Sequence, residues 1–498
     1  MSSFTSPYSL VVIGAGTDCR DVRSRQQTEL TVVICEREVV VGPLLAAESP
    51  PCADCFTFWL RMHQRSSTHA KLDHQVWVQT ASVIEDALAT DGAKLNGMQI
   101  RLDFQTGDVT EYPVPMRANC VHCQKGHSAQ LPLDALLNPC LGLIDELVTI
   151  PESPFGMGVA HGVAVGRRIT SDNFSEHVRM AVGGSSLMPR DPRLALLMEA
   201  AERHSLLYWP DDRGRLNCEH LPSRITDHTV RADLLTGKEQ ALVPAEAVFL
   251  GFSGSDHPTW DADTNGCGAG LSYADALESA IYELVERDAL ARWWFFRPRG
   301  NRVDLDGDEF TRHLASTLRE AQCRLWCLDI TDRCVGIPVV VACLSNSDGE
   351  RIYLGASARS TRQEATRKAC QEAVQFWLLG GLVGDPDSKK QWLENATTDN
   401  EPWIEGRPGD AVSIHRAQEK LLDLPAIVNF LMRSGYKIFH INMTRPWLQI
   451  PVARVIIPGL SAQSRTNWSF CLDDGNSGRS IAERTKGLPF PSIPDCPL

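Results

Sequence analysis

The tetrad Glu-x-x-Glu-Arg occurs twice in this chain, each time within a stretch rich in alanine and leucine. Residues three and four apart share a helix face, so each tetrad places two carboxylates and a guanidinium side by side. Carboxylates that close repel one another unless a cation or a donor group lies between them. The repeat therefore predicts two halves of one site for a polyanion and a metal ion. The six residues are Glu199, Glu202, Arg203, Glu283, Glu286 and Arg287.

Composition narrows the class of protein. The 498 residues suffice for two or three domains, and a net charge of −13 argues against non-specific binding to nucleic acid or to a membrane surface. The start lacks a secretory pattern, and no run approaches the length of a membrane-spanning segment. The 16 cysteines then favour reduced thiols, some of them metal ligands. We expect a cytoplasmic protein.

Two Cys-x-x-Cys pairs lie in the first third of the chain, Cys52 with Cys55 and Cys120 with Cys123. Each pair follows residues typical of turns. Four thiolates suit a structural zinc ion with no open coordination position. Four unrelated cysteines, or a redox-active pair, remain the alternatives. The segment before them ends a strand-like run in Gly14-Ala15-Gly16, which is incomplete as a dinucleotide loop and reads as a turn.

The chain alternates β-like and helical segments, which predicts a mixed α/β or α+β fold. A Pro/Gly-rich passage, Pro151 to Gly158, is typical of a linker between a first domain, residues 1–148, and a larger one, residues 158–498. A pseudo-repeat around the two tetrads is expected in the larger domain. Predicted strands include Leu10–Ile13, Leu30–Cys35, Ala247–Gly251, Cys323–Ile330, Ile337–Leu344, Ile438–Ile441 and Ala453–Ile457. Predicted helices include Arg193–Leu207, Ala274–Phe296, Thr361–Leu379 and Ile427–Arg433.

A glycine-rich segment precedes each tetrad, Gly183–Ser186 before the first and Asn265–Gly270 before the second. A single polar helix face is most simply a solvated one with internal ion pairs. Two such faces, each after glycine-rich backbone that can present N–H donors to phosphate, favour Mg²⁺ held against a triphosphate. Ser279 lies on the same arc as Glu283 and Glu286. The chain has no P-loop motif.

A third helical stretch carries Glu372 and Gln375 in Ala369–Gln375. Taken alone it says little, because such residues on an alanine-rich helix usually face solvent.

Together these segments resemble the YcaO family of ATP-dependent enzymes that modify peptide backbones. The stretch Glu286–Trp294 looks like its azoline-forming branch, as do Gly336–Val339 and Val455–Gly459. The N-terminal part, with its two cysteine pairs, is similar to the zinc-bearing, E1-like domain found with those enzymes, in a shortened form.

The resemblance implies a cyclodehydratase of ribosomally made peptides. A Cys, Ser or Thr side chain of the substrate attacks the preceding amide carbonyl. The oxyanion then takes the γ-phosphoryl group of ATP, and loss of phosphate leaves a thiazoline or oxazoline.

The resemblance also implies roles for individual residues. It implies that Mg²⁺ is coordinated by Glu199, Glu202, Glu283 and Glu286. Arg203 and Arg287 are expected to contact phosphate. The nucleotide pocket is expected to be lined by Ser279, Glu372, Gln375 and Ser185. In this branch a proline-rich C-terminus reaches the active site, and Pro491 and Pro494 are the candidates here.

Three departures from the family pattern are visible. Ser185 stands where relatives usually carry a lysine, which implies weaker ATP binding unless a second basic residue substitutes for it. Trp377 replaces a usual arginine, and the terminal prolines are not strictly alternating.

The expected partners follow from the same resemblance. The substrate is a ribosomal precursor peptide. No winged-helix segment is recognisable before Tyr8, so we expect a separate protein to bind the leader peptide. A flavin-dependent azoline dehydrogenase and a second copy of the chain are further candidates, whereas nucleic acid and membrane are not expected.

Three other functions remain for comparison. One is a YcaO enzyme that forms thioamides or amidines, and another is a non-catalytic scaffold that docks a precursor peptide. The scaffold explains the six tetrad charges poorly, since they are costly on apolar helices without a counterion. An E1-like adenylating enzyme is disfavoured by the incomplete nucleotide loop.

Overall fold

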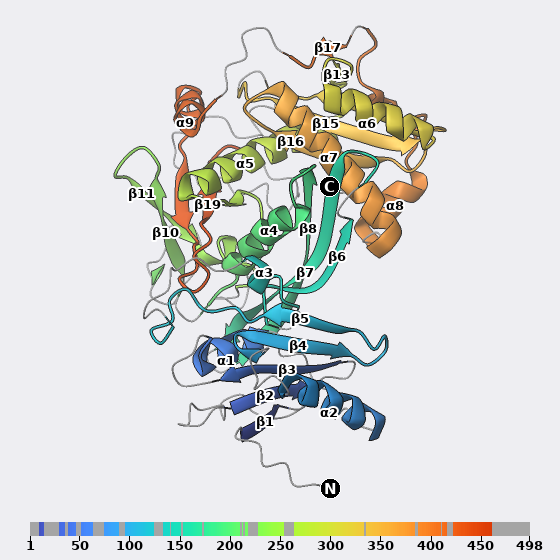
Figure 1. The fold of residues 1–498 in the computed structure, drawn as a ribbon. Coiled ribbons are helices and arrows are strands. Elements are labelled where there is room, and N and C mark those ends of the chain that lie inside the picture. The colour runs from blue at the N-terminus through green and yellow to red at the C-terminus, as the bar shows by residue number, and fades with distance from the viewer. Residues whose placement is uncertain are drawn as a thin grey trace. The chain divides into compact units, whose positions relative to one another are not determined.

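The fold of the chain is seen in a computed structural model (Figure 1). It describes residues 9–13, 29–34, 38–45, 51–62, 74–88, 95–123, 133–139, 141–150, 153–171, 174–209, 212, 215–217, 228–252, 263–332, 335–383, 387–409, 411–415 and 422–460. The predicted turn Gly14–Gly16 and the prolines Pro491 and Pro494 lie outside these residues. Among the described residues, no helix is both long and apolar enough to cross a membrane.

The chain forms two compact units. Unit 1 comprises Met1–Val148, Gly162–Val182 and Thr444–Gln449. Unit 2 comprises Thr149–His161, Gly183–Met443 and Ile450–Leu498. Helices and sheets are mixed in both units, so the α/β class predicted from the sequence is confirmed.

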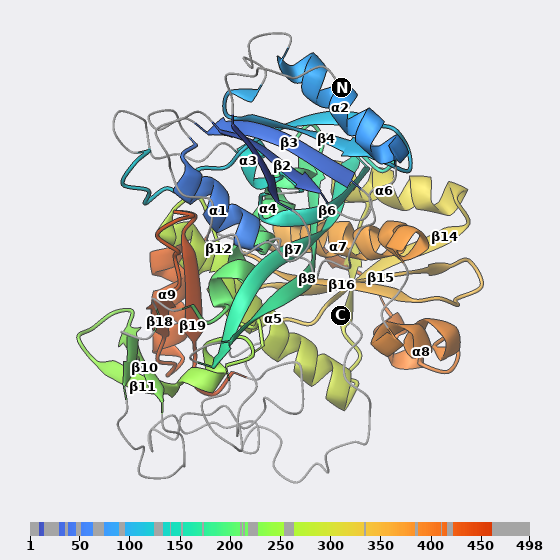
Figure 2. The same ribbon diagram turned by 90° about the horizontal axis from the view of Figure 1, so that it is seen from below.

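Unit 1 is built on a five-stranded sheet in the order β1-β2-β3-β4-β5, in which only the β1–β2 pair is parallel. Valines and leucines from β2, β3 and β4 form its core, and α2 covers them with Val83 and Ile84 (Figure 2). The strands predicted at Leu10–Ile13 and Leu30–Cys35 are confirmed as β1 and β2. The elements are β1 (Ser9–Ile13), β2 (Glu29–Ile34), β3 (Glu38–Leu45), α1 (Ala53–Met62), α2 (His74–Leu88), β4 (Met98–Asp103), β5 (Val109–Pro113) and α3 (Leu133–Leu136).

A three-stranded sheet, β6-β7-β8, follows in the chain. Its two long strands contribute residues to both units. Strand β7 begins at Met157, inside the passage that the sequence suggests as a linker. The elements are β6 (Ile144–Ile150), β7 (Met157–Ser171), β8 (Phe174–Leu187) and α4 (Pro192–Leu206).

Unit 2 contains a six-stranded sheet in the order β11-β10-β18-β19-β12, with β9 paired to β10. All of these pairs are antiparallel. Buried side chains of β19 pack against α5 (Tyr273–Phe296) and α9. The elements are β9 (Leu216–Asn217), β10 (Thr229–Leu234), β11 (Gln240–Pro244), β12 (Cys267–Ala269), α9 (Leu424–Arg433), β18 (Phe439–Asn442) and β19 (Val452–Ile456).

A second sheet of unit 2, in the order β16-β15-β14-β13-β17, is covered on both faces. Along β15 the side chains alternate, as the pleat requires. Val340 and Ala342 pack with residues of α6 and α7, whereas Val341 and Cys343 pack with residues of α5 (Figure 1). The elements are α5 (Tyr273–Phe296), β13 (Asn301–Asp304), α6 (Glu309–Glu320), β14 (Cys323–Asp329), β15 (Val339–Asn346), β16 (Tyr353–Ala358), α7 (Arg362–Val383), α8 (Asp387–Asn395), a 3₁₀ turn (Pro402–Glu405) and β17 (Val412–Ser413).

One predicted strand is wrong. Residues 247–251 do not extend, because the chain enters them through a 3₁₀ turn at Ala245–Ala247. The backbone N–H groups of Val248 and Phe249 both donate to Ala245. Only Leu250 makes a β-bridge, to Leu207. The apolar run is buried as a turn and not as a strand.

Candidate functional site

The first tetrad is attached to the strand that precedes it. Glu199 lies on α4, and its Oε2 atom accepts the backbone N–H of Gly183 in β8 at 2.8 Å. Its Oε1 atom accepts a bond from Arg203 at 3.1 Å. The helix starts where the sequence dictates, with Asp191 as N-cap and Pro192 as the first helical residue. One carboxylate thus joins a helix, a strand and a guanidinium.

The glycines before the first tetrad lie in strand β8 and not in a loop. A Cβ atom on Gly184 would fall 2.3 Å from the backbone nitrogen of Leu196 and 2.7 Å from the carbonyl oxygen of Pro192. Such contacts with helix backbone leave no room for a side chain. The glycine is therefore required so that α4 can lie close against β8.

The second tetrad repeats this arrangement. The Oε2 atom of Glu283 accepts the backbone N–H of Cys267 in β12 at 3.1 Å. A Cβ atom on Gly268 would lie 2.6 Å from the nitrogen of Ala280, so glycine again allows strand and helix to approach. Ser272 caps α5 in a capping box.

A third copy appears on α7. The Oε2 atom of Glu372 accepts the backbone N–H of Ala356 in β16 at 2.7 Å. Gly355 packs against the backbone of α7 at Ala369 and Ala373. In all three copies the glutamate follows its N–H donor by 16 residues. The sequence of α7 does not predict this third copy, because it contains no Glu-x-x-Glu-Arg tetrad.

The second carboxylates of the tetrads lie where their charge is unfavourable. Burial raises the pKa of Glu202 well above the ordinary glutamate range, and the Glu283 carboxylate raises it further. Burial also raises the pKa of Glu286 to about 7, with a further contribution from Glu372. Glu286 additionally accepts the backbone N–H of Ala358 at 3.3 Å. These carboxylates crowd one another in a way that a bound cation relieves.

Both tetrad arginines lie among these carboxylates. The Nη2 atom of Arg203 donates to Glu199. Burial lowers the pKa of Arg203, but the charges of Glu202 and Glu199 outweigh burial and raise the pKa above its ordinary value. Arg287 lies 3.6 Å from Glu286 and 3.9 Å from Glu283. The structure therefore brings all six tetrad residues into one part of unit 2.

The remaining candidate pocket residues lie near the same three strands. The amide nitrogen of Gln375 is packed against Gly183, where a Cβ atom would fall 2.4 Å from it. Ser279 is exposed on α5, with its Cβ close to Gly268. Ser185 is half-buried in β8, directly after Gly184.

Sequence reasoning missed two basic residues of this region. Lys368 lies one helical turn before Glu372, and desolvation together with the charge of Arg359 lowers the pKa of Lys368 to about 8, although its side chain remains solvent-accessible. Arg359 follows β16 and lies over the ring of Tyr282 at 5.8 Å. Spacing offers one signal for Lys368, since it stands four residues before a glutamate.

Arg454 on β19 was also missed. Its Nη1 atom donates to the carbonyl of Asp263 at 2.9 Å and to the sulfur of Cys267 at 3.3 Å. It is 6% exposed. Because Cys267 also holds Glu283 through its N–H, this buried guanidinium fixes the strand behind the second tetrad.

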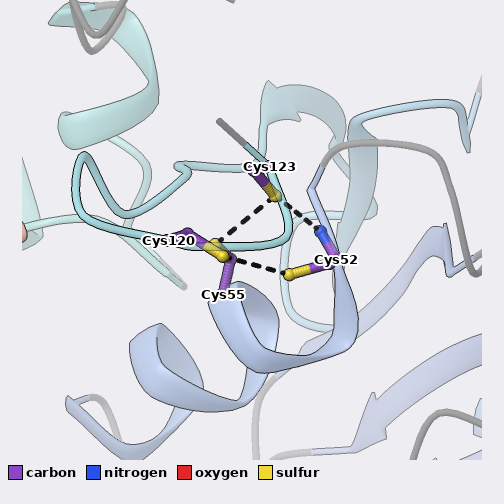
Figure 3. A group of neighbouring side chains, drawn as sticks. All are labelled: Cys52, Cys55, Cys120 and Cys123. Carbon is purple, nitrogen blue, oxygen red and sulfur yellow. Dashed lines mark hydrogen bonds between the residues drawn. The ribbon is translucent and has the colours of Figure 1, made fainter. Parts of the chain in front are cut away.

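The four cysteines of the two pairs come together in unit 1 (Figure 3). Their sulfur atoms all lie within 4.8 Å of one another. Cys52 and Cys120 are 3.5 Å apart, and Cys55 and Cys123 are 3.8 Å apart. The reading of four unrelated cysteines is thereby excluded.

The donor set fits a tetrahedral metal ion. Zinc–sulfur bonds of about 2.3 Å in a tetrahedron place sulfur atoms about 3.8 Å apart, close to the observed separations. Backbone N–H groups of Cys52 and Arg117 donate to the sulfurs of Cys123 and Cys55. Hydrogen bonding to Cys55 is the main cause that lowers the pKa of Cys52 to about 4. The cluster can therefore bind zinc.

Comparison with known proteins finds one matching family model and several structures of the same fold. Residues 219–461 match the family model described as "YcaO cyclodehydratase, ATP-ad Mg2+-binding". An uncharacterized protein of Methanothermobacter thermautotrophicus is 26% identical over 326 residues, which is 58% of this chain and 82% of that protein.

Solved structures share the fold. A heterocyclase in complex with substrate and cofactor superposes with a TM-score of 0.71 at 20% identity, over 93% of this chain and 78% of its own. The heterocyclase TruD gives 0.59 at 18% identity, over 93% and 75%. YcaO from Methanopyrus kandleri, bound with AMPPCP and Mg²⁺, gives 0.52 at 20% identity, over 64% and 86%.

The family match covers α5 and α7 with the second and third strand–helix copies, and the fold of the heterocyclases extends over nearly the whole chain. The resemblance noted from the sequence is thus confirmed. Residues 219–461 match the YcaO family, and the chain shares its fold with heterocyclases.

Proposed function

We propose that the protein is an ATP-dependent cyclodehydratase that converts Cys, Ser or Thr residues of a ribosomal precursor peptide into azolines. One observation carries the proposal. Three glutamates on three helices are each fixed to a strand backbone, and the tetrads add carboxylates and guanidinium groups between them. Such a preorganised mixture of charges suits Mg²⁺ and a triphosphate. The Mg²⁺ and AMPPCP bound by the Methanopyrus kandleri relative support it.

The proposed roles follow the positions of the residues. Mg²⁺ is held by the four tetrad glutamates, where it neutralises phosphate charge, and Arg203 and Arg287 contact phosphate oxygens. The nucleotide pocket is completed by Ser185, Ser279, Glu372 and Gln375. The four glutamates are Glu199, Glu202, Glu283 and Glu286.

The protein does not need a covalent nucleophile for this reaction. The substrate thiol or hydroxyl loses its proton to solvent as it attacks the preceding amide carbon. The resulting oxyanion takes the γ-phosphoryl group of ATP, and ADP leaves. The amide nitrogen then loses its proton, the carbon–oxygen bond breaks, and phosphate departs with the former amide oxygen as a C=N bond forms. Positioning and charge neutralisation are the contributions left to the chain.

Lys368 supplies the cation that relatives usually carry at the position of Ser185, which here lies in strand β8. It lies one turn from Glu372 on α7 and next to Arg359. Its ammonium is partly desolvated and forms no ion pair with a carboxylate among the described residues, so a phosphate bound next to it would stabilise its charge.

The cysteine cluster is proposed to hold a structural zinc ion. Four sulfur ligands fill the coordination sphere, so zinc there stabilises unit 1 and takes no part in the reaction.

The partners are proposed on the resemblance to heterocyclases, one of which was solved with a substrate. They are a precursor peptide, a separate leader-binding protein, and a flavin-dependent dehydrogenase that oxidises azolines. A homodimer and a role for Pro491 and Pro494 in the active site belong to the same proposal.

A labelling experiment tests the chemistry. The chain is incubated with Mg·ATP and synthetic Cys-, Ser- and Thr-containing peptides whose amide carbonyls carry heavy oxygen, with candidate partners added. We expect the peptide to lose one water and the heavy oxygen to appear in inorganic phosphate. The variant Glu286→Gln should transfer none.

The other outcomes identify the alternatives. If added sulfide replaces the amide oxygen without ring formation, the protein is a thioamide-forming YcaO enzyme. If peptides bind and Mg·ATP does not, it is a docking scaffold.

A further inference from the structure

The two tetrads are members of a set of three. The third copy reads Glu372-x-x-Gln375-Phe376, with the first glutamate retained and the following Glu-Arg pair replaced. All three glutamates make the same bond to a strand N–H donor 16 residues earlier. The three helices and their strands are thus equivalent in position, although only two are equivalent in sequence.

The three copies close into a ring. Helix α4 of copy one contacts strand β12 of copy two, which holds Glu283 through Cys267, and the charge of Glu283 raises the pKa of Glu202 on that helix. The second position of copy two, Glu286, lies near Glu372 and bonds to Ala358 in the strand of copy three. We call these two meeting points joint 1–2 and joint 2–3.

The third joint closes the ring through Gln375. Its amide nitrogen touches Gly183, the residue whose N–H holds Glu199 of copy one. Joint 3–1 therefore has one carboxylate and one amide, whereas each of the other two joints has two carboxylates.

The amide has a direct physical consequence. A pair of facing carboxylates attracts a divalent cation. Gln375 is uncharged, and it turns its NH₂ group, a donor that cannot bind a cation, towards Gly183. The arginine that accompanies each second glutamate is missing as well, since Phe376 packs in the apolar core instead. Joint 3–1 therefore has neither the second carboxylate nor the arginine of the other two copies.

We propose that Gln375 determines how many divalent cations the ring holds, by keeping joint 3–1 free of metal while joints 1–2 and 2–3 each take one. This rests on the proposed Mg·ATP function and adds a specificity-determining role for Gln375. It also changes the proposed set of metal ligands, because Glu372 joins it at joint 2–3 and Glu199 is left to hold Arg203. The amide then offers its N–H groups to an anionic oxygen of the nucleotide, which a third cation would displace.

Titration of the full chain with Mn²⁺, followed by the electron paramagnetic resonance of free Mn²⁺ with and without ATP, tests the proposal. The wild type should bind two ions, and Gln375→Glu should bind a third, already without nucleotide. Gln391→Glu, which adds the same charge at an exposed site of α8, should stay at two.

A second pair of variants distinguishes a change in metal binding from a failure to fold. Glu286→Gln alone should reduce the stoichiometry to one. Adding Gln375→Glu to it should restore two, because a carboxylate pair is removed at joint 2–3 and created at joint 3–1. Circular dichroism checks each variant for native structure.

Two results overturn the inference in different ways. If the wild type binds two ions and folded Gln375→Glu also binds two, the role of Gln375 is refuted while the nucleotide site stands. If the wild type binds neither Mn²⁺ nor Mn·ATP, the proposed function fails and the inference fails with it.

Discussion

The Oε2 atom of Glu286 accepts the backbone N–H of Ala358 at 3.3 Å, so a carboxylate of α5 is bonded to the end of strand β16. The same strand donates the N–H of Ala356 to Glu372 on α7. One strand therefore positions carboxylates from two helices. Since β16 is buried throughout, these carboxylates are held by rigid structure and not by mobile loops.

Gly184→Ala should damage the site from outside it. The new methyl group would meet the backbone of Leu196 at 2.3 Å, and α4 must then move away from β8 together with Glu199. We expect a loss of about 1–3 kcal/mol in the free energy of unfolding, and a larger proportional loss of nucleotide affinity. Denaturant unfolding and calorimetry measure the two effects.

Gly237→Ala is the matched control. Its methyl group would come close only to the flexible end of Leu234, at 3.0 Å, and would lie at an ordinary contact distance of 3.9 Å from the nitrogen of Glu239. If both variants show the same free energy of unfolding and the same nucleotide affinity, close strand–helix packing at Gly184 has no special role.

Lys368→Met should weaken ATP binding. Replacing the ammonium removes a charge-assisted contact to phosphate worth about 1.5–3 kcal/mol, so we expect the Kd to rise by about tenfold or more. Fluorescence titration with a labelled ATP analogue measures the change. Lys390→Met, at an exposed position of α8, should leave the Kd unchanged, and equal effects of the two variants would refute the role of Lys368.

Asp308 allows a pH-dependent test of the packing between α6 and α7, the helix that carries Glu372. Its buried carboxylate caps α6 through Thr311 and is bonded to Gln363 and Arg367 of α7. Burial raises the pKa of Asp308, but the bonds from Arg367 and Gln363 outweigh it and bring the pKa below the ordinary 3.8. The charged form therefore stabilises the fold above that pH, and the contribution is lost as the pH falls through the lowered value.

Asp308→Ala should accordingly cost about 2–4 kcal/mol at neutral pH, from the lost cap and the charged bonds. Unfolding at several pH values measures the difference from wild type. That difference should shrink below pH ~4 as the wild-type carboxylate is protonated. A difference that stays constant with pH would show that the charge of Asp308 contributes nothing.

Cys120→Ser should remove the zinc ion and destabilise unit 1. Three thiolates bind zinc less tightly than four, and binding energy at a structural site is folding energy. We expect one zinc per chain in the wild type and little in the variant, by elemental analysis. Cys323→Ser, in unit 2, should retain zinc, and zinc loss from both variants would argue against the cluster as its site.

The helices of the site could be predicted closely because their signals are local. The stretches predicted at Arg193–Leu207 and Ala274–Phe296 are α4 and α5 to within a residue or two, since alanine-rich repeats and caps mark them. The cysteine pairs were also predictable, because Cys-x-x-Cys at turns has few structural uses.

The rest depends on tertiary contacts that no local pattern reveals. Gly183 and Gly184 looked like a phosphate loop because glycine is poor in strands, yet close approach of α4 demands glycine there. The third copy escaped notice because Gln375 and Phe376 replace the residues that make a tetrad recognisable. Lys368 and Arg454 enter the site from other elements, so spacing alone does not connect them with it.

Isothermal calorimetry with Mg·ATP tests the central claim most directly, on wild type and on the double variant Glu283→Gln with Glu286→Gln. Glutamine keeps the size of each side chain and an oxygen to accept from Cys267 and Ala358. Glu320→Gln with Glu350→Gln removes the same charge at exposed positions as a control. We predict that wild type and control bind Mg·ATP in the micromolar range, and that the variant with Glu283→Gln and Glu286→Gln does not bind it. Equal binding by all three proteins, or none by the wild type with its partner present, would contradict the account.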